Sequence, residues 1–332
     1  MSITASQVKE LRDRTNAGMM ECKKALQETD GDIEAAIKKL REAGAIKAAK
    51  KADRSAKEGI VAAQIEPDAK HGILAEINCE TDFVAKNDNF QAFVAELVRA
   101  VAESGATDVE AAHALPHADG SIEDFVKSKV IELGENLQFR RMTRYDMEGS
   151  GLVGSYIHLG GKVGVMLEVG CENDDTVSND DFRALVKDLT LHIAALSPAG
   201  INRDDIPAEL VESEKEIARK ELEARGVPAE RIDGAAQGKL GKFYAERCLL
   251  EQSFVKDPDV SVGALLETTG KSLGDTLSIR RFVRYALGEE RSPSPHPFMQ
   301  TSRLLAGFFV LHRARSLPPK PKIILVFPAP PP

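Results

Sequence analysis

The chain has 332 residues, of which 42% are hydrophobic and 29% charged, a balance typical of ordinary globular proteins. Its formal net charge of −8 argues against broad nucleic-acid binding, which favours a basic face, although a local basic site stays compatible with it. We find no apolar run near the roughly 20 residues that span a bilayer, no secretory signal and no paired metal-ligand spacing of the four cysteines, so we expect a cytoplasmic protein with reduced thiols.

Residues 1–45 predict a module of three short helices. A capping-box sequence at residues 4–7 precedes the first apolar stripe, and two further stripes follow at helical spacing. Gly44 is the expected end of the third helix. Because Met19 and Met20 are adjacent on a helix, we expect one of them in the core and the other exposed to a partner.

A basic linker is predicted at residues 46–58. Its lysines and arginines could contact nucleic acid or an acidic partner. A solvated helical linker is the favoured interpretation, because runs of charge usually face water.

The rest of the chain contains an internal repeat. Residues 59–102 recur at 151–194 with a constant offset of 92, and residues 137–145 recur at 277–285 with an offset of 140. The growth of the offset from 92 to 140 requires a net insertion of 48 residues in the second copy, between about 195 and 260. Matched pairs include Gly59 and Gly151, Cys79 and Cys171, Asp82 and Asp174, Asn87 and Asn179, and Phe90 and Phe182.

Both copies predict the same order of elements: two strands, a helix that starts after an Asn-Asp cap, and a strand that contains Arg-Arg. We therefore predict an α+β protein with two duplicated subdomains, each an antiparallel sheet with helices on one face. The first two predicted strands are 59–66 and 72–78 in subdomain N (59–146), and 151–157 and 162–169 in subdomain C (147–288), with a hairpin turn at Gly160-Gly161.

Two further segments stand apart from the repeat. The insertion predicts a helical hairpin at about 203–256, with one helix over 208–225 and a second from 229 to about 254. The tail at 289–332 holds ten of the sixteen prolines and is predicted to be disordered.

The two copies differ most after Cys79, where the first has Phe83 and the second has Asp175. A Phe between a strand and a helix most often packs on its own core. Because the second copy tolerates Asp175 there, the balance shifts toward a Phe83 ring displayed to a partner, whose burial would contribute on the order of 1.5–3 kcal/mol. Asp82 is repeated as Asp174, so a cap would explain it, although its charge could also disturb a neighbouring metal or phosphate site.

Catalytic motifs are thin. The sequence has no Gly-rich loop followed by Lys-Ser/Thr, no His-Glu-x-x-His and no nucleophile elbow. His192 lies on an apolar helix face and is expected to be a core histidine, whereas His158, near a hairpin end, is kept as a candidate. We therefore expect neither an enzyme nor a bound cofactor nor a metal centre.

Several segments together resemble the bacterial elongation factor Ts family, over roughly residues 2–288. They include Ala17-Gly18-Met19-Met20-Glu21-Cys22-Lys23-Lys24-Ala25-Leu26, Gly44-Ala45-Ile46-Lys47-Ala48-Ala49-Lys50-Lys51, Cys79-Glu80-Thr81-Asp82-Phe83-Val84-Ala85-Lys86 and Gly154-Ser155-Tyr156-Ile157-His158. The resemblance implies an N-terminal module like the ubiquitin-associated (UBA) domain, a core of two similar subdomains, and a coiled-coil hairpin in the second.

The resemblance also implies a function: guanine nucleotide exchange on elongation factor Tu, without covalent catalysis. One segment would approach the Mg²⁺ side of Tu's nucleotide site and displace the ion, while the N-terminal module docks on Tu's nucleotide domain and the second subdomain holds a more distant domain. The residues implied for Mg²⁺ displacement are Thr81, Asp82, Phe83 and Val84, and those implied for partner binding are Arg12, Met19, Met20, Lys23 and His158.

Two other functions stay open. Residues 4–44 with the basic linker could serve a ribosome- or nascent-chain-associated binding protein, with the Arg-Arg strands on RNA, but the charge of −8 and the asymmetry at Phe83 argue against it. A metabolic enzyme ranks third. We expect no membrane and no direct nucleic-acid partner, and a homodimer through the helical hairpin is left open.

Overall fold

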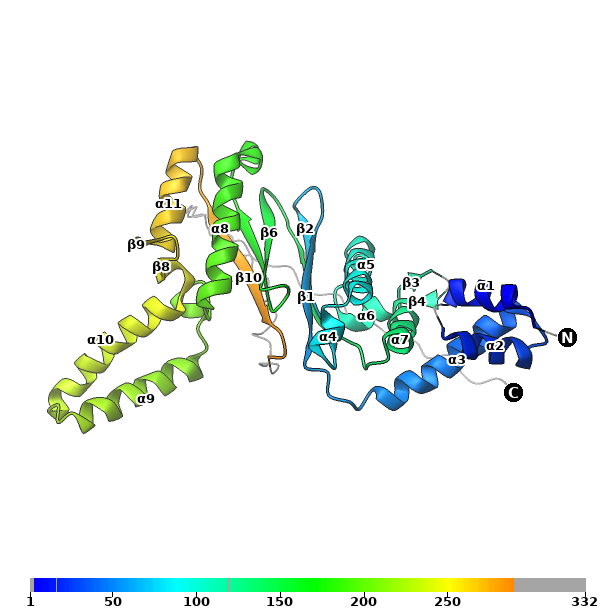
Figure 1. Cartoon of the computed structure of the whole chain (residues 1–332). Helices are drawn as coiled ribbons and strands as arrows, with labels where there is room; N and C mark the ends of the chain where they lie inside the picture. The colour runs from blue at the N-terminus through cyan, green and yellow to red at the C-terminus, as the bar shows by residue number, and fades with distance from the viewer. Residues whose placement is uncertain (1–2, 16, 119, 290–332) are drawn as a thin grey trace, which may run out of the picture. The chain divides into compact units, whose positions relative to one another are not determined.

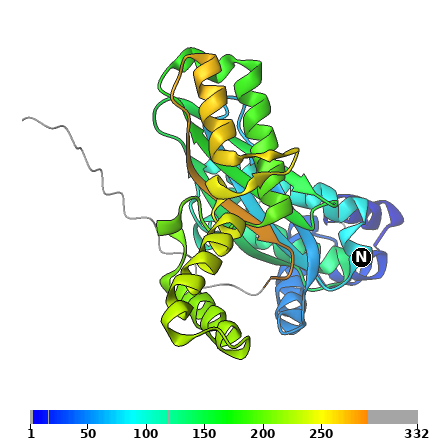
Figure 2. The same cartoon turned by 90° about the vertical axis from the view of Figure 1, so that its left-hand side faces the viewer.

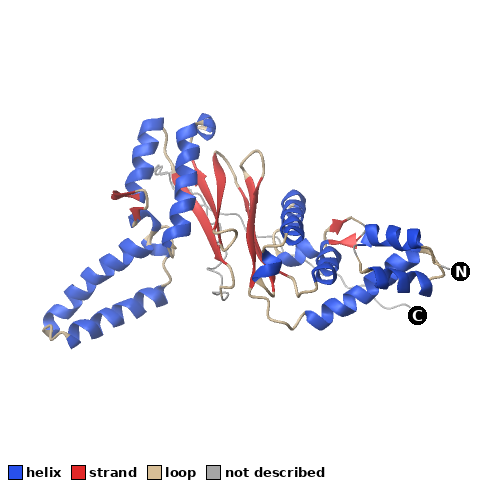
Figure 3. Ribbon diagram, in the orientation of Figure 1, coloured by secondary structure: helices blue, strands red, loops and turns tan. Residues whose placement is uncertain are grey.

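The computed structural model of the chain describes residues 3–15, 17–118 and 120–289. Within them, helices and antiparallel strands are mixed along the chain, as the α+β prediction requires (Figure 1, Figure 3). Apart from Glu289, the predicted tail lies outside the described residues, so its disorder stays a prediction.

Three helices form a small N-terminal cluster with its own apolar core. The capping box is confirmed, since Gln7 N–H donates to Thr4 Oγ1 at 3.3 Å and Thr4 N–H donates to Gln7 Oε1 at 3.0 Å. The helices are α1 (Ala5–Thr15), α2 (Met19–Glu28) and α3 (Ile33–Lys51). Their predicted stripes supply the core, which consists of Val8, Leu11, Ala17, Cys22, Ala25, Leu26, Ala36 and Ile37.

The third helix is longer than predicted, because Gly44 lies inside α3 rather than at its end. Gly44 is buried, and a Cβ atom there would overlap the side chain of Ile131 on α7 (Ile122–Leu133). The glycine therefore permits close helix packing instead of ending the helix. The predicted basic linker consequently begins as helix, and Lys51 Nζ donates to the carbonyl oxygen of Gly134, just after α7.

The first copy folds as a three-stranded antiparallel sheet of order β1-β2-β5. Asn87 caps α5 as predicted, its side chain accepting a hydrogen bond from Asn89 N–H at 2.8 Å. The strands are β1 (Glu58–Ile65), β2 (His71–Cys79) and β5 (Gln138–Asp146); the other elements are α4 (Asp82–Ala85), α5 (Asp88–Ser104), α6 (Val109–His113), the pair β3 (Pro116–His117) and β4 (Gly120–Ser121), and α7.

The second copy repeats this order as a sheet β6-β7-β10. The predicted hairpin turn is confirmed, with positive φ of 65° at Gly160 and 94° at Gly161, and Asn179 caps α8. Figure 2 shows α8 and α11 beside each other over this sheet. The strands are β6 (Gly151–His158), β7 (Val163–Gly170), β10 (Ser278–Ala286) and the short pair β8 (Ser253–Phe254) and β9 (Asp257–Ser261); the helices are α8 (Asp180–Leu196), α11 (Val262–Leu273) and the 3₁₀ helices η1 (Asp174–Ser178), η2 (Arg203–Asp205) and η3 (Leu249–Glu251).

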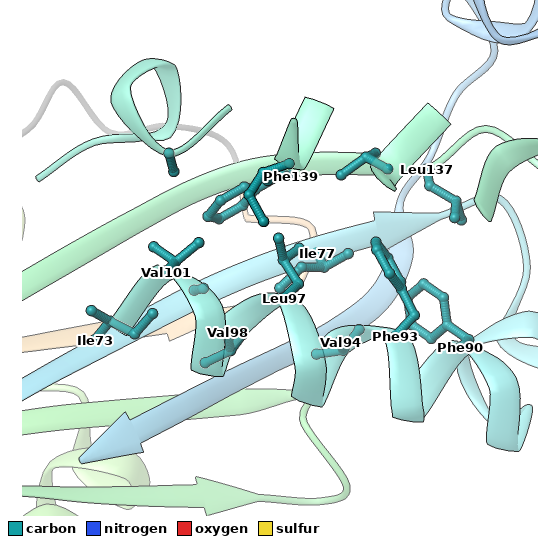
Figure 4. Packing of buried hydrophobic residues seen from close by; sticks show 14 of the residues in the cluster. Ile73, Ile77, Phe90, Phe93, Val94, Leu97, Val98, Val101, Leu137 and Phe139 are labelled. Atoms are coloured by element: carbon teal, nitrogen blue, oxygen red, sulfur yellow. The ribbon is translucent and has the colours of Figure 1, made fainter. Parts of the chain in front are cut away.

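Each sheet buries one face under its own helices. In the first copy α5 supplies the main apolar stripe, which points at β2 and β5 (Figure 4). Phe90 and Phe93 are almost fully buried, which stabilises the fold by about 1.5–3 kcal/mol for each ring. In the second copy Phe182, Leu185 and Leu189 of α8 form the equivalent stripe, so both predicted helix faces are confirmed.

The opposite faces of the two sheets pack on each other. Arg141 lies 4.0 Å above the ring of Tyr285, and Arg281 lies 4.1 Å above the ring of Tyr145. Each copy thus contributes one arginine and one tyrosine to these two contacts, and each cation–π contact stabilises the interface by about 0.5–2 kcal/mol. The apolar layer between the sheets consists of Val61, Leu74, Tyr145, Met147, Val153, Met166 and Tyr285.

The insertion contains two packed helices, α9 (Ala208–Ala224) and α10 (Ala229–Arg247), which contact each other through Ala218, Leu222 and Ala236. The second helix ends at Arg247 instead of continuing to about Phe254. Leu249 and Phe254, which follow this helix end, are buried in the core of the second copy. A straight helix that continued to Phe254 would place both side chains beyond that core.

Candidate functional site

The segment that differs between the copies follows β2 directly. Thr81 caps the short helix α4, its Oγ1 accepting a hydrogen bond from Val84 N–H at 3.3 Å. Ala85 is buried, whereas Phe83 is 82% exposed, the highest value among the large apolar side chains that the structure describes. Phe83 therefore does not pack on its own core.

A carboxylate from another element anchors the backbone of this segment. The N–H groups of Glu80 and Thr81 each donate to Glu135 Oε2 at 3.0 Å, and Thr81 Oγ1 donates to Glu135 Oε1 at 2.6 Å. Asn136 N–H in turn donates to Glu80 Oε1 at 2.7 Å. The connection between α7 and β5 thus fixes the start of α4.

The second copy anchors its equivalent segment in the same way. Asp275, at offset 140 from Glu135, accepts hydrogen bonds from the N–H groups of Glu172 at 3.0 Å and Asn173 at 3.1 Å, and from Thr176 Oγ1 at 2.5 Å. The Thr176 hydroxyl, assisted by backbone N–H groups and opposed by burial, lowers the pKa of Asp275 to about 2. The anchored backbone is therefore common to both copies.

The side chains displayed on this shared backbone differ, because exposed Asp175 stands where the first copy has Phe83. Sequence analysis found this difference but missed Glu135 and Asp275. A signal for them was present, since both are acidic and both follow a Leu-Gly pair at the offset of 140.

Asp82 is paired within its own helix. Lys86 Nζ lies 2.8 Å from Asp82 Oδ2, and the side chains are 76% and 46% exposed, respectively. The hydrogen bond from Lys86 lowers the pKa of Asp82, so the carboxylate is ionised at neutral pH. Lys162, in the turn between β6 and β7, adds a weaker positive potential and is itself paired with Glu58 at 2.6 Å. Because water surrounds the Asp82 pair, its carboxylate is free to exchange Lys86 for another cation.

The N-terminal docking candidates lie on a separate surface, because α1 and α2 pack with α3 while α4 packs on β1 and β2. Met19 is 55% and Met20 75% exposed, so the expectation that one of them would be in the core was wrong. Both occupy the first turn of α2, and the buried side of this helix begins at Cys22. Arg12 and Lys23 are exposed as well.

The two histidines singled out from the sequence have different surroundings. His158 is exposed at the end of β6, with Nδ1 2.9 Å from Tyr156 Oη. His192 is fully buried with Nε2 3.0 Å from Gln252 Oε1, which confirms it as a core histidine. Burial lowers the pKa of His192 against the opposing effect of the Gln252 hydrogen bond.

Within the described ranges, no helix combines the length and apolar character needed to cross a bilayer, and no three or more His, Cys, Asp or Glu side chains cluster as metal ligands. All four cysteines are free and buried, and burial raises the pKa of each thiol, that of Cys79 to about 12.

Comparison with known proteins decides the family. A family model described as Elongation factor TS matches residues 80–289, more than half of the chain. The chain belongs to the elongation factor Ts family. Relatives named Elongation factor Ts include that of a Nitratiruptor species, 44% identical over 87% of this chain and 94% of the relative. Those of Trichlorobacter lovleyi and Clostridium perfringens are each 44% identical over 92% of this chain and 99% of the relative.

Membership in the elongation factor Ts family makes this chain a translation elongation factor of bacterial type. The matched stretch begins at Glu80, so it includes α4, the anchoring Glu135 and the whole second copy. The exposed ring and its anchored segment therefore lie within the family's shared region.

Proposed function

We propose that this elongation factor Ts family member is a guanine nucleotide exchange factor for elongation factor Tu. It would bind Tu·GDP, displace Mg²⁺ and promote release of GDP so that GTP can bind. The observation that carries the proposal is Phe83, 82% exposed on an anchored segment whose duplicate has Asp175 instead. A ring held in water in this way gains on the order of 1.5–3 kcal/mol when a partner buries it.

The residues of the segment would have distinct roles. Thr81 fixes the start of α4, and Val84 closes its first turn on the Thr81 hydroxyl. Phe83 would insert between side chains of Tu on the Mg²⁺ side of the nucleotide, and Asp82, released from Lys86, would rearrange the ion's ligands. Mg²⁺ neutralises and bridges phosphate oxygens, so its loss weakens GDP binding.

No covalent step is required of the chain, and we propose an exchange factor rather than an enzyme in the usual sense. A factor that binds empty Tu more tightly than Tu·GDP must weaken GDP binding by the same ratio. A thousandfold weakening corresponds to roughly 4 kcal/mol, within reach of lost metal contacts and one buried ring. This activity belongs to the cytoplasm and needs neither a membrane nor direct contact with nucleic acid.

Two further surfaces would complete the contact with Tu. The N-terminal cluster would act as a UBA-like docking module on Tu's nucleotide domain. Met19 and Met20 offer an adaptable apolar surface, and Arg12 and Lys23 add positive charge beside it. The second copy, with exposed His158, would hold a more distant domain of Tu.

The hairpin of α9 and α10 is proposed as a coiled-coil extension that joins two copies of the chain. Leu210 and Ile217 of α9 are 39% and 48% exposed, which gives such a contact an apolar surface. Ile217→Glu should then convert a dimer to a monomer in light scattering at matched concentration, and a monomeric wild type would reject the contact.

The main test is release of a fluorescent GDP analogue from elongation factor Tu. Wild-type protein should accelerate release, and Phe83→Ala should be much slower while still binding Tu. Asp175→Ala, at the equivalent place of the second copy, is the matched control and should behave as wild type. An unchanged release rate with wild-type protein would exclude exchange activity. A ribosome- or nascent-chain-associated role would then be the favoured function.

A further inference from the structure

The connection between α7 and β5 joins three separate parts of the chain. Glu135 binds the backbone at the start of α4, as described above. Asn136 Nδ2 donates to the carbonyl oxygens of Ala52 at 3.2 Å and Arg54 at 2.8 Å, directly after α3. The side chain of Glu80 accepts the Asn136 N–H at 2.7 Å. The α4 segment, the end of α3 and the end of α7 therefore meet at two adjacent residues.

The Glu135 contacts restrict the orientation of α4. Its two oxygens hold two consecutive N–H groups and one hydroxyl, so both translation and rotation of the segment at Thr81 are constrained. Hydrogen bonds to an ionised carboxylate are stronger than those between neutral groups. Phe83 lies two residues further on and has no packing of its own to fix it, being 82% exposed.

The second copy provides an independent comparison. Asp275 makes the same three kinds of contact, yet the segment that it anchors displays Asp175 and no aromatic ring. The anchor itself is therefore part of the duplicated scaffold. Only in the first copy does it hold a side chain that would enter a partner.

We propose that Glu135 is a positioning residue for exchange, which holds α4 so that Phe83 enters the partner in one orientation without a search among loop conformers. This inference rests on the proposed exchange function. Without Glu135, the backbone N–H groups of Glu80 and Thr81 turn to water and the segment samples several orientations. Misplacement of a group that acts by position lowers the rate of the step, while the other docking surfaces keep the complex together.

The experiment measures release of the fluorescent GDP analogue from Tu at increasing factor concentration, which separates the maximal rate from the half-saturating concentration. Glu135→Ala should lower the maximal rate by about tenfold and change the half-saturating concentration by less than about twofold. Glu135→Gln should restore most of the rate, because its amide still accepts the two N–H groups and can donate to Thr81 Oγ1. Asp275→Ala removes the equivalent anchor and should keep the wild-type maximal rate.

Hydrogen exchange on the same variants gives a readout besides exchange activity. Amides in residues 80–86 should exchange faster in Glu135→Ala, and those in 172–178 faster in Asp275→Ala. The inference is overturned if Glu135→Ala keeps the wild-type maximal rate although its 80–86 amides are freed, or if Asp275→Ala loses as much rate as Glu135→Ala. If Glu135→Ala fails to fold, Glu135→Ser, which is polar but lacks the two carboxylate oxygens, takes its place in the same comparison with Asp275→Ala. Wild-type protein without any effect on release would instead overturn the proposed function itself.

Discussion

Glu76 offers a sharp test of how a buried carboxylate stabilises the sheet of the first copy. Its carboxylate is fully buried and accepts hydrogen bonds from Arg141 Nε at 2.6 Å, Arg140 Nη1 at 2.9 Å, and Asn78 Nδ2 and the Gly288 N–H at 3.1 Å each. Glu76→Gln keeps the shape of the side chain but removes the charge. It also turns an amide donor toward one of these donors.

The expected cost follows from burial. Removing one partner of a buried ion pair costs about 3–5 kcal/mol, because the remaining charges are left without compensation. Glu168 is the matched position in the second copy, with Arg281 Nε at 2.7 Å and Arg280 Nη1 at 3.5 Å. These two arginine side chains are 45% and 35% exposed, so water can replace the carboxylate, and Glu168→Gln should cost only about 1 kcal/mol.

Urea unfolding followed by circular dichroism would measure both losses, and hydrogen exchange in β2 and β7 would show which sheet is weakened. Burial acts to raise the pKa of Glu76, but the Gly288 N–H and Arg141 outweigh it and lower that pKa. The folded state therefore holds its proton less tightly than the unfolded chain. The stability gap between wild type and Glu76→Gln should be constant above about pH 5 and shrink as the pH falls below about 4.3. Equal losses in the two variants, or a gap that widens in acid, would refute this reasoning.

Three further outcomes are expected. Phe83→Ala should change the free energy of unfolding by less than about 0.5 kcal/mol, whereas Phe90→Ala should lower it by about 3–5 kcal/mol. Urea titration measures both changes, and a large loss in Phe83→Ala would mean that the ring packs on the core. Cys79, with a pKa of about 12, should carry on the order of one thiolate in 10⁴ at pH 8, so peptide mass spectrometry should find it unmodified by iodoacetamide in the native protein. Burial lowers the pKa of His192, so this histidine binds a proton more tightly in the unfolded chain than in the folded protein. The free energy of unfolding should therefore fall as the pH drops below about 6.5. His192→Gln should reduce this pH dependence, measured as the shift of the urea midpoint with pH.

Features set by neighbouring residues could be predicted from the sequence. The caps at Asn87 and Asn179 and the hairpin at Gly160 and Gly161 depend on backbone groups one to three residues away. The internal repeat made further elements predictable, because an element recognised in one copy could be checked in the other.

Features set by distant contacts could not be predicted in this way. A glycine at position 44 is typical of a helix end. Its actual role depends on Ile131, whose side chain packs against Gly44 in the folded protein. Glu135 lies 54 residues from Thr81, and no spacing rule connects them. Met19 matches an apolar stripe, yet its place in the first turn of α2 keeps it out of the core.

The duplication also explains where the sequence is free to change. Between the sheets, a substitution in one copy disturbs a contact with the other, since Arg141 stacks on Tyr285 and Arg281 stacks on Tyr145. The segment after β2 is instead anchored through backbone N–H groups, which nearly every residue type provides. The position of Phe83 is exposed, and the second copy keeps the same anchor with Asp175 there. Folding therefore gives no reason for an aromatic ring at Phe83, and a partner that buries the ring does.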